Sequence, residues 1–292
     1  LPGGDVHQRL QQCKVGGLPF GWSDRLSVGC DAALGLSHMH NSNPKAFHWD
    51  IKSPNIILPD ADMDQAIKGA YNAIYYNAGQ ACNAGSRLFA PSESFDEIVS
   101  GLTERAKTAR LGPGLDPETQ IGPLVNGAQY ARVQRLIQQG IDEGARLVAG
   151  GTGRPDGLNK GYFVKPTVFA DVNNQMTIAR TEIFGPVLCC LCVDSLDEAL
   201  AIVNDNPYGN GTSIFTASGA AARKYQSEVS VGQVGINVPI PVPLPFFSFT
   251  GWKNSFFGDL HAYGKQAVRF YTETKTITSR WPEDSIPAGP NL

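Results

Sequence analysis

Short apolar runs that alternate with amphipathic helical stretches constrain the fold of this chain more than any other feature of its sequence. The run "NIIL" at residues 55–58 and the run "PVLCCLCVD" at residues 186–194 are almost continuously apolar, a pattern typical of strands buried on both faces. Residues 60–80 instead place apolar side chains at helical spacing. This alternation predicts an α/β fold in which a mostly parallel sheet is flanked by helices.

The same alternation continues along the chain. Further strands are predicted at residues 86–91, 146–151, 162–172, 211–217 and 233–239, and further helices at residues 95–112, 128–145 and 195–206. Residues 268–280 alternate apolar or aromatic with polar side chains at a period of two. That pattern predicts a C-terminal edge strand that is exposed or paired with a partner.

Composition excludes several classes of protein. With 292 residues, of which 42% are apolar and 17% charged, the chain can bury a sizeable core. A net charge of -3 gives no basis for general binding to nucleic acid or to an acidic membrane, and no apolar run is long enough to span a bilayer. The six cysteines show no zinc spacing and no disulfide framework, which predicts no metal site and a cytoplasmic location.

One cysteine stands apart from the others. Cys82 lies in "YYNAGQACNAGSRLF", between a predicted helix and a predicted strand, among the small residues Gly79, Ala81, Ala84 and Gly85. Small neighbours let backbone N–H groups and a substrate approach the sulfur, so a thiolate here could attack a carbonyl while amides stabilise the oxyanion. The alternative interpretation is a small buried cysteine at a tight turn.

Five blocks resemble the NAD(P)-dependent aldehyde dehydrogenases in order and spacing, from Lys52 to about Trp281. They are "KSPNIILPDADMDQAIKGA" with "NAGQACNAGSRLFAP", then "GYFVKPTVFADV", "EIFGPVLCC", "DEALAIVNDNPYGNGTSIFT" and "GQVGINVP". The resemblance implies that Cys82 is the nucleophile, which forms a thiohemiacetal, passes hydride to NAD or NADP and becomes a thioester. It also implies that Glu182 and Phe184 contact the nicotinamide ribose and ring. Without it, Glu182 would be interpreted as a solvated loop carboxylate and Phe184 as core packing.

The C-terminal part narrows the resemblance. The stretch "GINVPIPVPLPFFSFTGWKNSFFGDLHAYGKQAVRF" is similar to methylmalonate-semialdehyde dehydrogenases, which implies coenzyme A as the acyl acceptor. The stretch around Cys82 reads instead like the members that hydrolyse their thioester. Phe246, Phe247 and Phe249 follow a proline-rich run and are candidates to line the substrate entrance, with buried loop packing as the alternative.

Two departures from the family pattern affect the expected activity. His48 stands where the family has the Glu that activates the deacylating water, and a histidine can act as a base near neutral pH. Asp50 and Ile51 replace two glycines beside the cofactor. The family's dinucleotide fold lies upstream of this strand, and no G-x-G-x-x-G occurs in the chain, so the cofactor domain is expected to be largely absent.

The N-terminal stretch supports a competing interpretation. Residues 1–57 resemble a catalytic-loop fragment of a protein kinase, with His48-Trp49-Asp50 in place of His-Arg-Asp. Asp50 would be the base, Lys52 a phosphate contact and Asn55 a ligand of Mg²⁺. No Asp-Phe-Gly follows and no glycine-rich loop precedes this stretch, so phosphotransfer is a remote alternative.

These patterns predict four segments and one main activity. Residues 1–51 are a kinase-like leader, 52–265 a dehydrogenase catalytic domain, 266–281 an oligomerisation strand and 282–292 a tail. The predicted activity is oxidation of a small aldehyde or semialdehyde by a homo-oligomer. The mitochondrial matrix is an alternative location if a transit peptide precedes the chain. The alternative is an inactive or non-redox dehydrogenase remnant with a reactive thiol or a partner-binding role.

Overall fold

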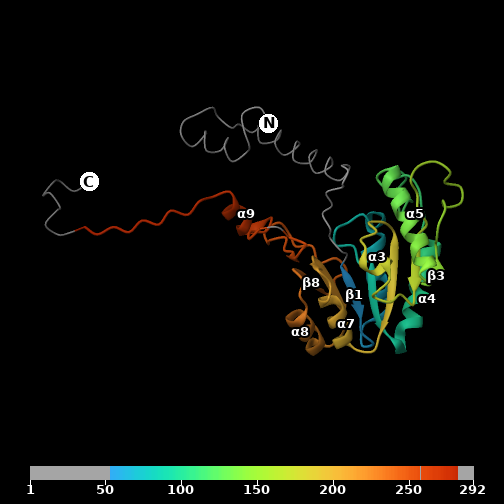
Figure 1. Cartoon of the computed structure of the whole chain (residues 1–292), viewed down its shortest axis with the longest axis horizontal. Coiled ribbons are helices and arrows are strands. Elements are labelled where there is room, and N and C mark those ends of the chain that lie inside the picture. The colour runs from blue at the N-terminus through green and yellow to red at the C-terminus, as the bar shows by residue number, and fades with distance from the viewer. Residues whose placement is uncertain (1–52, 257, 282–292) are drawn as a thin grey trace. The chain divides into compact units, whose positions relative to one another are not determined.

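The computed structural model describes residues 53–256 and 258–281 of the chain. The predictions on the kinase-like leader, on His48 and on the tail from residue 282 lie outside the described residues. The main element is a seven-stranded sheet (Figure 1). Its strands are β1 (Pro54–Ile57), β2 (Arg87–Pro91), β3 (Arg146–Ala149), β4 (Thr167–Ala170), β5 (Val187–Val193), β7 (Gly211–Phe215) and β8 (Gln233–Ile236).

The strand order is β3-β4-β5-β2-β1-β7-β8, and only β3 runs antiparallel to its neighbour. The register places Arg87 beside Cys189, and Asn55 beside both Leu88 and Ser213. The predicted mostly parallel α/β sheet is therefore confirmed. A separate two-stranded sheet joins β6 (Tyr208–Gly209) to β9 (Trp252–Lys253).

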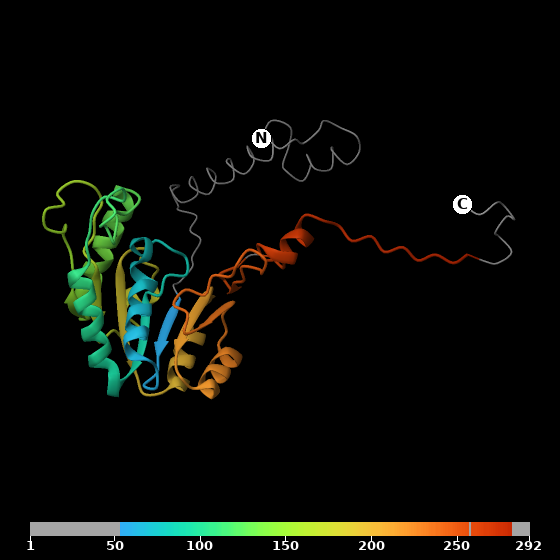
Figure 2. The same cartoon turned by 180° about the vertical axis from the view of Figure 1, so that it is seen from behind.

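Helices lie on both faces of the seven-stranded sheet (Figures 1 and 2). On one face, α3 packs against α4, and its Gly69 approaches the ring of Phe215. On the other face, Gly140 of α5 approaches Phe169, and Tyr225 of α8 meets Thr212. The helices are α3 (Met63–Tyr75), α4 (Ser92–Thr108), α5 (Gly127–Asp142), α6 (Thr177–Arg180), α7 (Leu196–Asn204) and α8 (Gly219–Glu228).

Several helices begin where the sequence provides a capping side chain. Asp62 accepts a hydrogen bond from the backbone N–H of Gln65 at the start of α3, and Asn126 caps α5 through Gln129 in the same way. Ser195 caps α7 by accepting from the N–H of Glu198. A cap of this kind is worth about 1 kcal/mol because it satisfies one of the orphan donors of the first turn.

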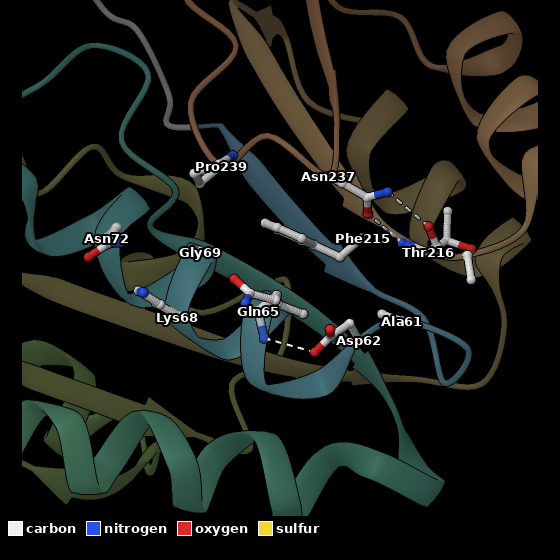
Figure 3. A pocket seen from close by; sticks show the side chains of 12 residues that line it. Ala61, Asp62, Gln65, Lys68, Gly69, Asn72, Phe215, Thr216, Asn237 and Pro239 are labelled. Atoms are coloured by element: carbon white, nitrogen blue, oxygen red, sulfur yellow. Dashed lines mark hydrogen bonds between the residues drawn. The ribbon is translucent and has the colours of Figure 1, made fainter.

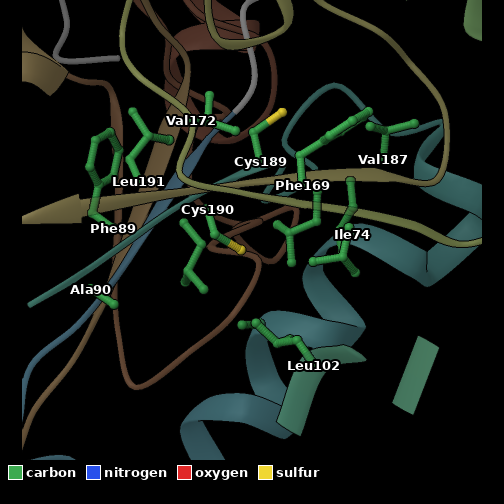
Figure 4. Packing of buried hydrophobic residues seen from close by; sticks show 14 of the residues in the cluster. Ile74, Phe89, Ala90, Leu102, Phe169, Val172, Val187, Cys189, Cys190 and Leu191 are labelled. Carbon is green, nitrogen blue, oxygen red and sulfur yellow. The ribbon is translucent and has the colours of Figure 1, made fainter. Parts of the chain in front are cut away.

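Part of the hydrophobic core packs around β5 and its neighbour β2 (Figure 4). Phe89, Phe169, Cys189 and Cys190 are at most 1% exposed. Replacing either phenylalanine by alanine would cost roughly 3–5 kcal/mol. Burial raises the pKa of the Cys190 thiol far above its usual value, so this thiol stays protonated. Cys192, which lies on the same predicted buried strand, is exposed.

Three features differ from the sequence prediction. Helix α8 was not predicted, because its run of alanines with Arg223 and Lys224 has a weak apolar pattern. The predicted edge strand near residues 268–280 was wrong in its first part, where α9 (Gly264–Phe270) forms instead. No residue of α9 is buried, so local helix preference decides its conformation rather than packing. Residues 272–281 are exposed and pair with no strand among the described residues.

Candidate active site

The Cys82 loop, residues 76–86, joins the end of α3 to the start of β2. It opens with a 3-10 turn, Tyr76–Gly79, in which Asn77, Ala78 and Gly79 have φ values of 50°, 54° and 71°. Three consecutive residues in the left-handed region are uncommon, and strain of this kind gathers at functional sites. Cys82 follows this turn and is exposed, which excludes the alternative of a buried cysteine.

Gly79 brings a second loop against the first. A Cβ atom built at Gly79 would lie 2.1 Å from the carbonyl oxygen of Gly185, a distance that no side chain tolerates. Gly185 precedes β5 and directly follows Phe184. The structure therefore brings the Cys82 loop together with the loop that carries Glu182 and Phe184, as the predicted site requires.

The 182–185 loop is held by side chains of α5. Gln129 Nε2 donates to the carbonyl oxygens of Ile183 and Phe184 at 2.9 and 2.8 Å, and Arg132 donates to the carbonyl of Glu182. Partial burial lowers the pKa of Arg132, and the nearby Glu182 carboxylate counteracts that shift. Phe184 has a φ of 56°, so its backbone is held in the left-handed region. With its carbonyls fixed by α5, this loop has a defined conformation beside the Cys82 loop.

A third contact comes from β7 at the same edge of the sheet. Asn210, which directly precedes β7, donates from Nδ2 to the carbonyl oxygen of Cys82 at 3.1 Å. Cys82, Gly185 and Asn210 all precede parallel strands, namely β2, β5 and β7. The candidate site is therefore at the amino-terminal edge of the sheet.

The three aromatic residues predicted to line the substrate entrance differ in how they pack. Phe246 and Phe247 are 77% and 67% exposed, and Phe249 packs edge-on against Tyr263 with ring centroids 6.2 Å apart. Buried loop packing is thereby excluded for Phe246 and Phe247. Their role in substrate binding stays a prediction.

A cavity of about 550 Å³, which no sequence pattern predicted, lies at the opposite, carboxyl-terminal edge (Figure 3). Its walls come from the first turns of α3 and from residues that end or follow β7 and β8, with Phe215 as the largest buried side chain. The side chain of Asn237 in this cavity is occupied by two hydrogen bonds that it exchanges with the backbone of Thr216. Gln65 and Lys68 are exposed at its rim.

Within residues 53–256 and 258–281, no group of three or more His, Cys, Asp or Glu side chains could hold a metal ion. Over the same ranges, no helix is long and apolar enough to cross a membrane.

A model of the aldehyde dehydrogenase family matches residues 41–277. The chain belongs to this family. Among curated relatives, a probable methylmalonate-semialdehyde/malonate-semialdehyde dehydrogenase [acylating], mitochondrial, of Dictyostelium discoideum is 46% identical over 270 residues, which are 90% of this chain and 50% of the relative. The corresponding enzyme of Bos taurus is 48% identical over 80% of this chain and 43% of its own length.

Solved aldehyde dehydrogenase structures share the fold. A putative methylmalonate-semialdehyde dehydrogenase from Sinorhizobium meliloti, complexed with NAD, superposes with a TM-score of 0.77 at 42% identity. The match covers 80% of this chain and 48% of that structure. The chain thus spans about half the length of the relatives it matches. An aldehyde dehydrogenase from Mycobacterium tuberculosis, complexed with NAD+, matches with a TM-score of 0.71 at 43% identity, over 76% of this chain and 45% of that structure.

Proposed function

We propose that this chain carries the nucleophile of an NAD-type dehydrogenase that oxidises a small aldehyde or semialdehyde. One observation supports the proposal most strongly: the exposed Cys82 lies on a strained loop in contact with the 182–185 loop. The relatives whose printed names include methylmalonate-semialdehyde dehydrogenase favour a semialdehyde as the substrate.

Cys82 would act as the covalent catalyst. Its thiolate adds to the aldehyde carbon, and the carbonyl oxygen becomes the oxyanion of a thiohemiacetal. Loss of a hydride from that carbon restores the carbonyl and leaves a thioester on Cys82. Attack by a second nucleophile, either water or the thiol of coenzyme A, then releases the acyl group and the Cys82 thiol.

The residues present fit one part of a nicotinamide cofactor. NAD, when bound, supplies the acceptor for the hydride. Glu182 and Phe184 would contact the nicotinamide ribose and ring, since their loop is fixed beside the Cys82 loop through the hydrogen bonds from α5 and the contact of Gly79 with Gly185. NAD is favoured over NADP because the solved relatives named above are NAD complexes. Transfer of the acyl group to coenzyme A is favoured by the word "acylating" in the names of the curated relatives.

The exposed C-terminal segment would connect subunits. Ile277 and Trp281 are 79% and 80% exposed, and the segment around them keeps its alternation of apolar and polar residues. A homo-oligomer that buries this segment is the simplest explanation of that exposure. Sedimentation of the chain with and without residues 272–281 tests it: loss of the segment should reduce the oligomer to a smaller species, and an unchanged mass would contradict the proposal.

The activity is tested by following the absorbance of reduced nicotinamide with a panel of aldehydes and semialdehydes, with and without coenzyme A. Stimulation by coenzyme A identifies the acylating reaction, and reaction without it identifies hydrolysis. Hydrolysis of an activated ester that depends on Cys82, without any reduction of NAD or NADP, would replace the proposal by a non-redox thiol enzyme. Silence in both assays would overturn both.

A further inference from the structure

We infer that Asn210 is a positioning residue for Cys82 and that Gln233 fixes Asn210 in the orientation this requires. The inference rests on the proposed role of Cys82 as the nucleophile. Asn210 directly precedes β7 and Gln233 begins β8, and these two strands are paired neighbours in the sheet.

Asn210 reaches Cys82 across a long separation in sequence. The two residues lie 128 positions apart, and the hydrogen bond between Asn210 Nδ2 and the Cys82 carbonyl oxygen measures 3.1 Å. Asn210 is 2% exposed, so water does not compete freely for this amide. A hydrogen bond from a buried amide restrains the peptide plane that follows Cys82.

Gln233 determines which way the amide of Asn210 faces. Gln233 Nε2 donates to Asn210 Oδ1 at 3.3 Å and to the carbonyl of Thr250 at 2.8 Å. The backbone N–H of Gln233 also donates to the carbonyl of Asn210 at 3.0 Å. Because Oδ1 of Asn210 accepts from Gln233, its Nδ2 is left to donate to Cys82.

The carbonyl of Cys82 matters because no helix or strand holds this residue. Gln80 holds the part of the loop that precedes Cys82. Its Oε1 accepts from the N–H of Val125 at 2.9 Å, and its Nε2 donates to the carbonyl of Asn77 at 3.2 Å. Together, Gln80 and Asn210 restrain the loop before and after the thiol. With the peptide planes fixed, the direction of the Cα–Cβ bond of Cys82 is fixed as well, which limits the positions that Sγ can take to the staggered rotamers.

The same hydrogen bonds connect the nucleophile to the segment that carries the predicted substrate-entrance residues. Thr250 directly follows Phe249, and its hydroxyl donates to the carbonyl of Gly232, the residue before Gln233. Cys82, Asn210, Gln233 and Thr250 thus form one continuous series of contacts. A change at Gln233 should therefore reach Cys82 only through Asn210.

The test compares three variants of the full chain: Asn210→Leu, Gln233→Met and the double variant. The matched control is Asn204→Leu, because Asn204 also donates to one backbone carbonyl, of Glu228, and accepts from one backbone N–H, of Ser230.

Acylation of Cys82 by p-nitrophenyl acetate depends on the direction of the thiol and on oxyanion stabilisation. Alkylation by iodoacetamide, followed by peptide mapping, depends only on exposure and ionisation. Amide hydrogen exchange of residues 80–86 reports the order of the loop without any activity.

Asn210→Leu should slow acylation about tenfold, as loss of one buried hydrogen bond implies, while Cys82 alkylation changes less than about twofold. Gln233→Met should slow acylation about threefold, and the double variant should match Asn210→Leu, because the effects share one path. Exchange at 80–86 should accelerate in all three variants and not in Asn204→Leu.

Three results would overturn the inference: unchanged acylation and exchange, an equal fall in alkylation, or new alkylation of the buried Cys189 and Cys190, which would mean general loosening. If the unaltered chain neither reduces NAD or NADP nor is acylated, the proposed function fails. The exchange of residues 80–86 then decides the positioning role alone.

Discussion

The two edges of the parallel sheet differ in how they are built. At the amino-terminal edge, the Cys82 loop approaches the 182–185 loop closely at Gly79 and Gly185, and it accepts a hydrogen bond from Asn210, while Gln129 donates to the 182–185 loop. At the carboxyl-terminal edge, a cavity of about 550 Å³ opens beside exposed side chains of α3. Ligands of open α/β sheets usually bind at the carboxyl edge. The described cavity and the better-organised chemistry therefore lie at opposite edges of this protein.

This comparison shows that volume alone is a poor guide to the reactive site. Gln65, Lys68 and Asn72 at the cavity rim have no side-chain hydrogen bond or ion pair among the described residues, so nothing fixes their positions. The loops at the amino edge keep left-handed backbone at Asn77, Ala78 and Phe184, whereas among the residues that line the cavity Asn237 alone does so. Strain is retained where surrounding contacts over-determine it, and that is the property a catalytic loop needs.

The largest expected effect separates the two exposed thiols. Cys82→Ala should lower aldehyde oxidation and ester acylation by roughly a thousandfold or more, because the nucleophile is removed. Cys192→Ala, which removes the other exposed cysteine of the described residues, should leave both rates within about twofold. Steady-state rates of the two variants measure this difference. Equal losses in both variants would remove the amino edge from the mechanism.

The second prediction uses one glycine from each edge. Gly79→Ala forces a side chain to a φ of 71° and puts its Cβ 2.1 Å from the carbonyl oxygen of Gly185. We expect a loss of about 2 kcal/mol or more in unfolding free energy, together with most of the acylation rate, because the two loops must separate. Urea unfolding and ester acylation measure the two effects.

Gly69→Ala is the matched variant at the cavity. Its Cβ would meet the ring of Phe215 at 2.8 Å and Pro239 at an ordinary 3.8 Å, and a gain in helix propensity of about 1 kcal/mol offsets the adjustment of that ring. Stability should change by less than about 1 kcal/mol, and the acylation rate should not change. A larger loss of activity in Gly69→Ala than in Gly79→Ala would reverse the comparison.

The elements of this fold could be predicted from the sequence because their patterns are local. The run "PVLCCLCVD" and the helical spacing of residues 60–80 correspond to β5 and α3, since burial on both sheet faces leaves a direct trace in composition. Helix α8 and helix α9 were missed because neither has a marked apolar stripe. For residues 268–270, the alternation of apolar and polar side chains at a period of two predicted a strand, but these residues belong to a helix.

Residues of the candidate site could be predicted only where a recognisable sequence motif contains them. Cys82 has a recognisable neighbourhood of small residues, and the resemblance supplied Glu182 and Phe184. Asn210 and Gln233 stand inside blocks that the sequence matched, but nothing local shows that an amide 128 positions away reaches the Cys82 carbonyl. Contacts of that kind depend on sheet order, in which β7 lies beside β1, and the sequence does not state that order.

A smaller effect is expected from a substitution at Phe215, the largest buried side chain of the cavity. Phe215 is 4% exposed and belongs to the core, so Phe215→Leu should cost about 1 kcal/mol through imperfect repacking. The acylation rate should stay within about twofold of the unaltered chain, because the residue ends β7 at the edge away from Cys82. Denaturant unfolding gives the first value and ester acylation the second. A tenfold loss of acylation would show that the two edges are coupled.

The smallest expected effect is a pH-dependent change in stability at Glu143, which holds the helix that precedes the 182–185 loop. Glu143, which follows α5, accepts hydrogen bonds from the N–H and hydroxyl of Thr177 at 2.7 and 2.5 Å, and so holds α6 just before that loop. The bond from the Thr177 hydroxyl lowers the pKa of the Glu143 carboxyl below its ordinary value of 4.5. A carboxyl with a lower pKa in the folded state stabilises the fold above its unfolded pKa, and this contribution is lost as the pH falls.

Glu143→Gln should therefore lower the melting temperature near neutral pH by a few degrees or less, and the difference should shrink as the pH falls below about 4.5. Glu97→Gln is the control, because Glu97 is exposed on α4 and makes no hydrogen bond or ion pair among the described residues. Thermal unfolding across a pH series measures both variants. A pH-independent difference for Glu143→Gln, or an equal one for Glu97→Gln, would mean that α6 is held by packing alone. The amino edge would then depend on Gln129 and Arg132 for the order of its second loop.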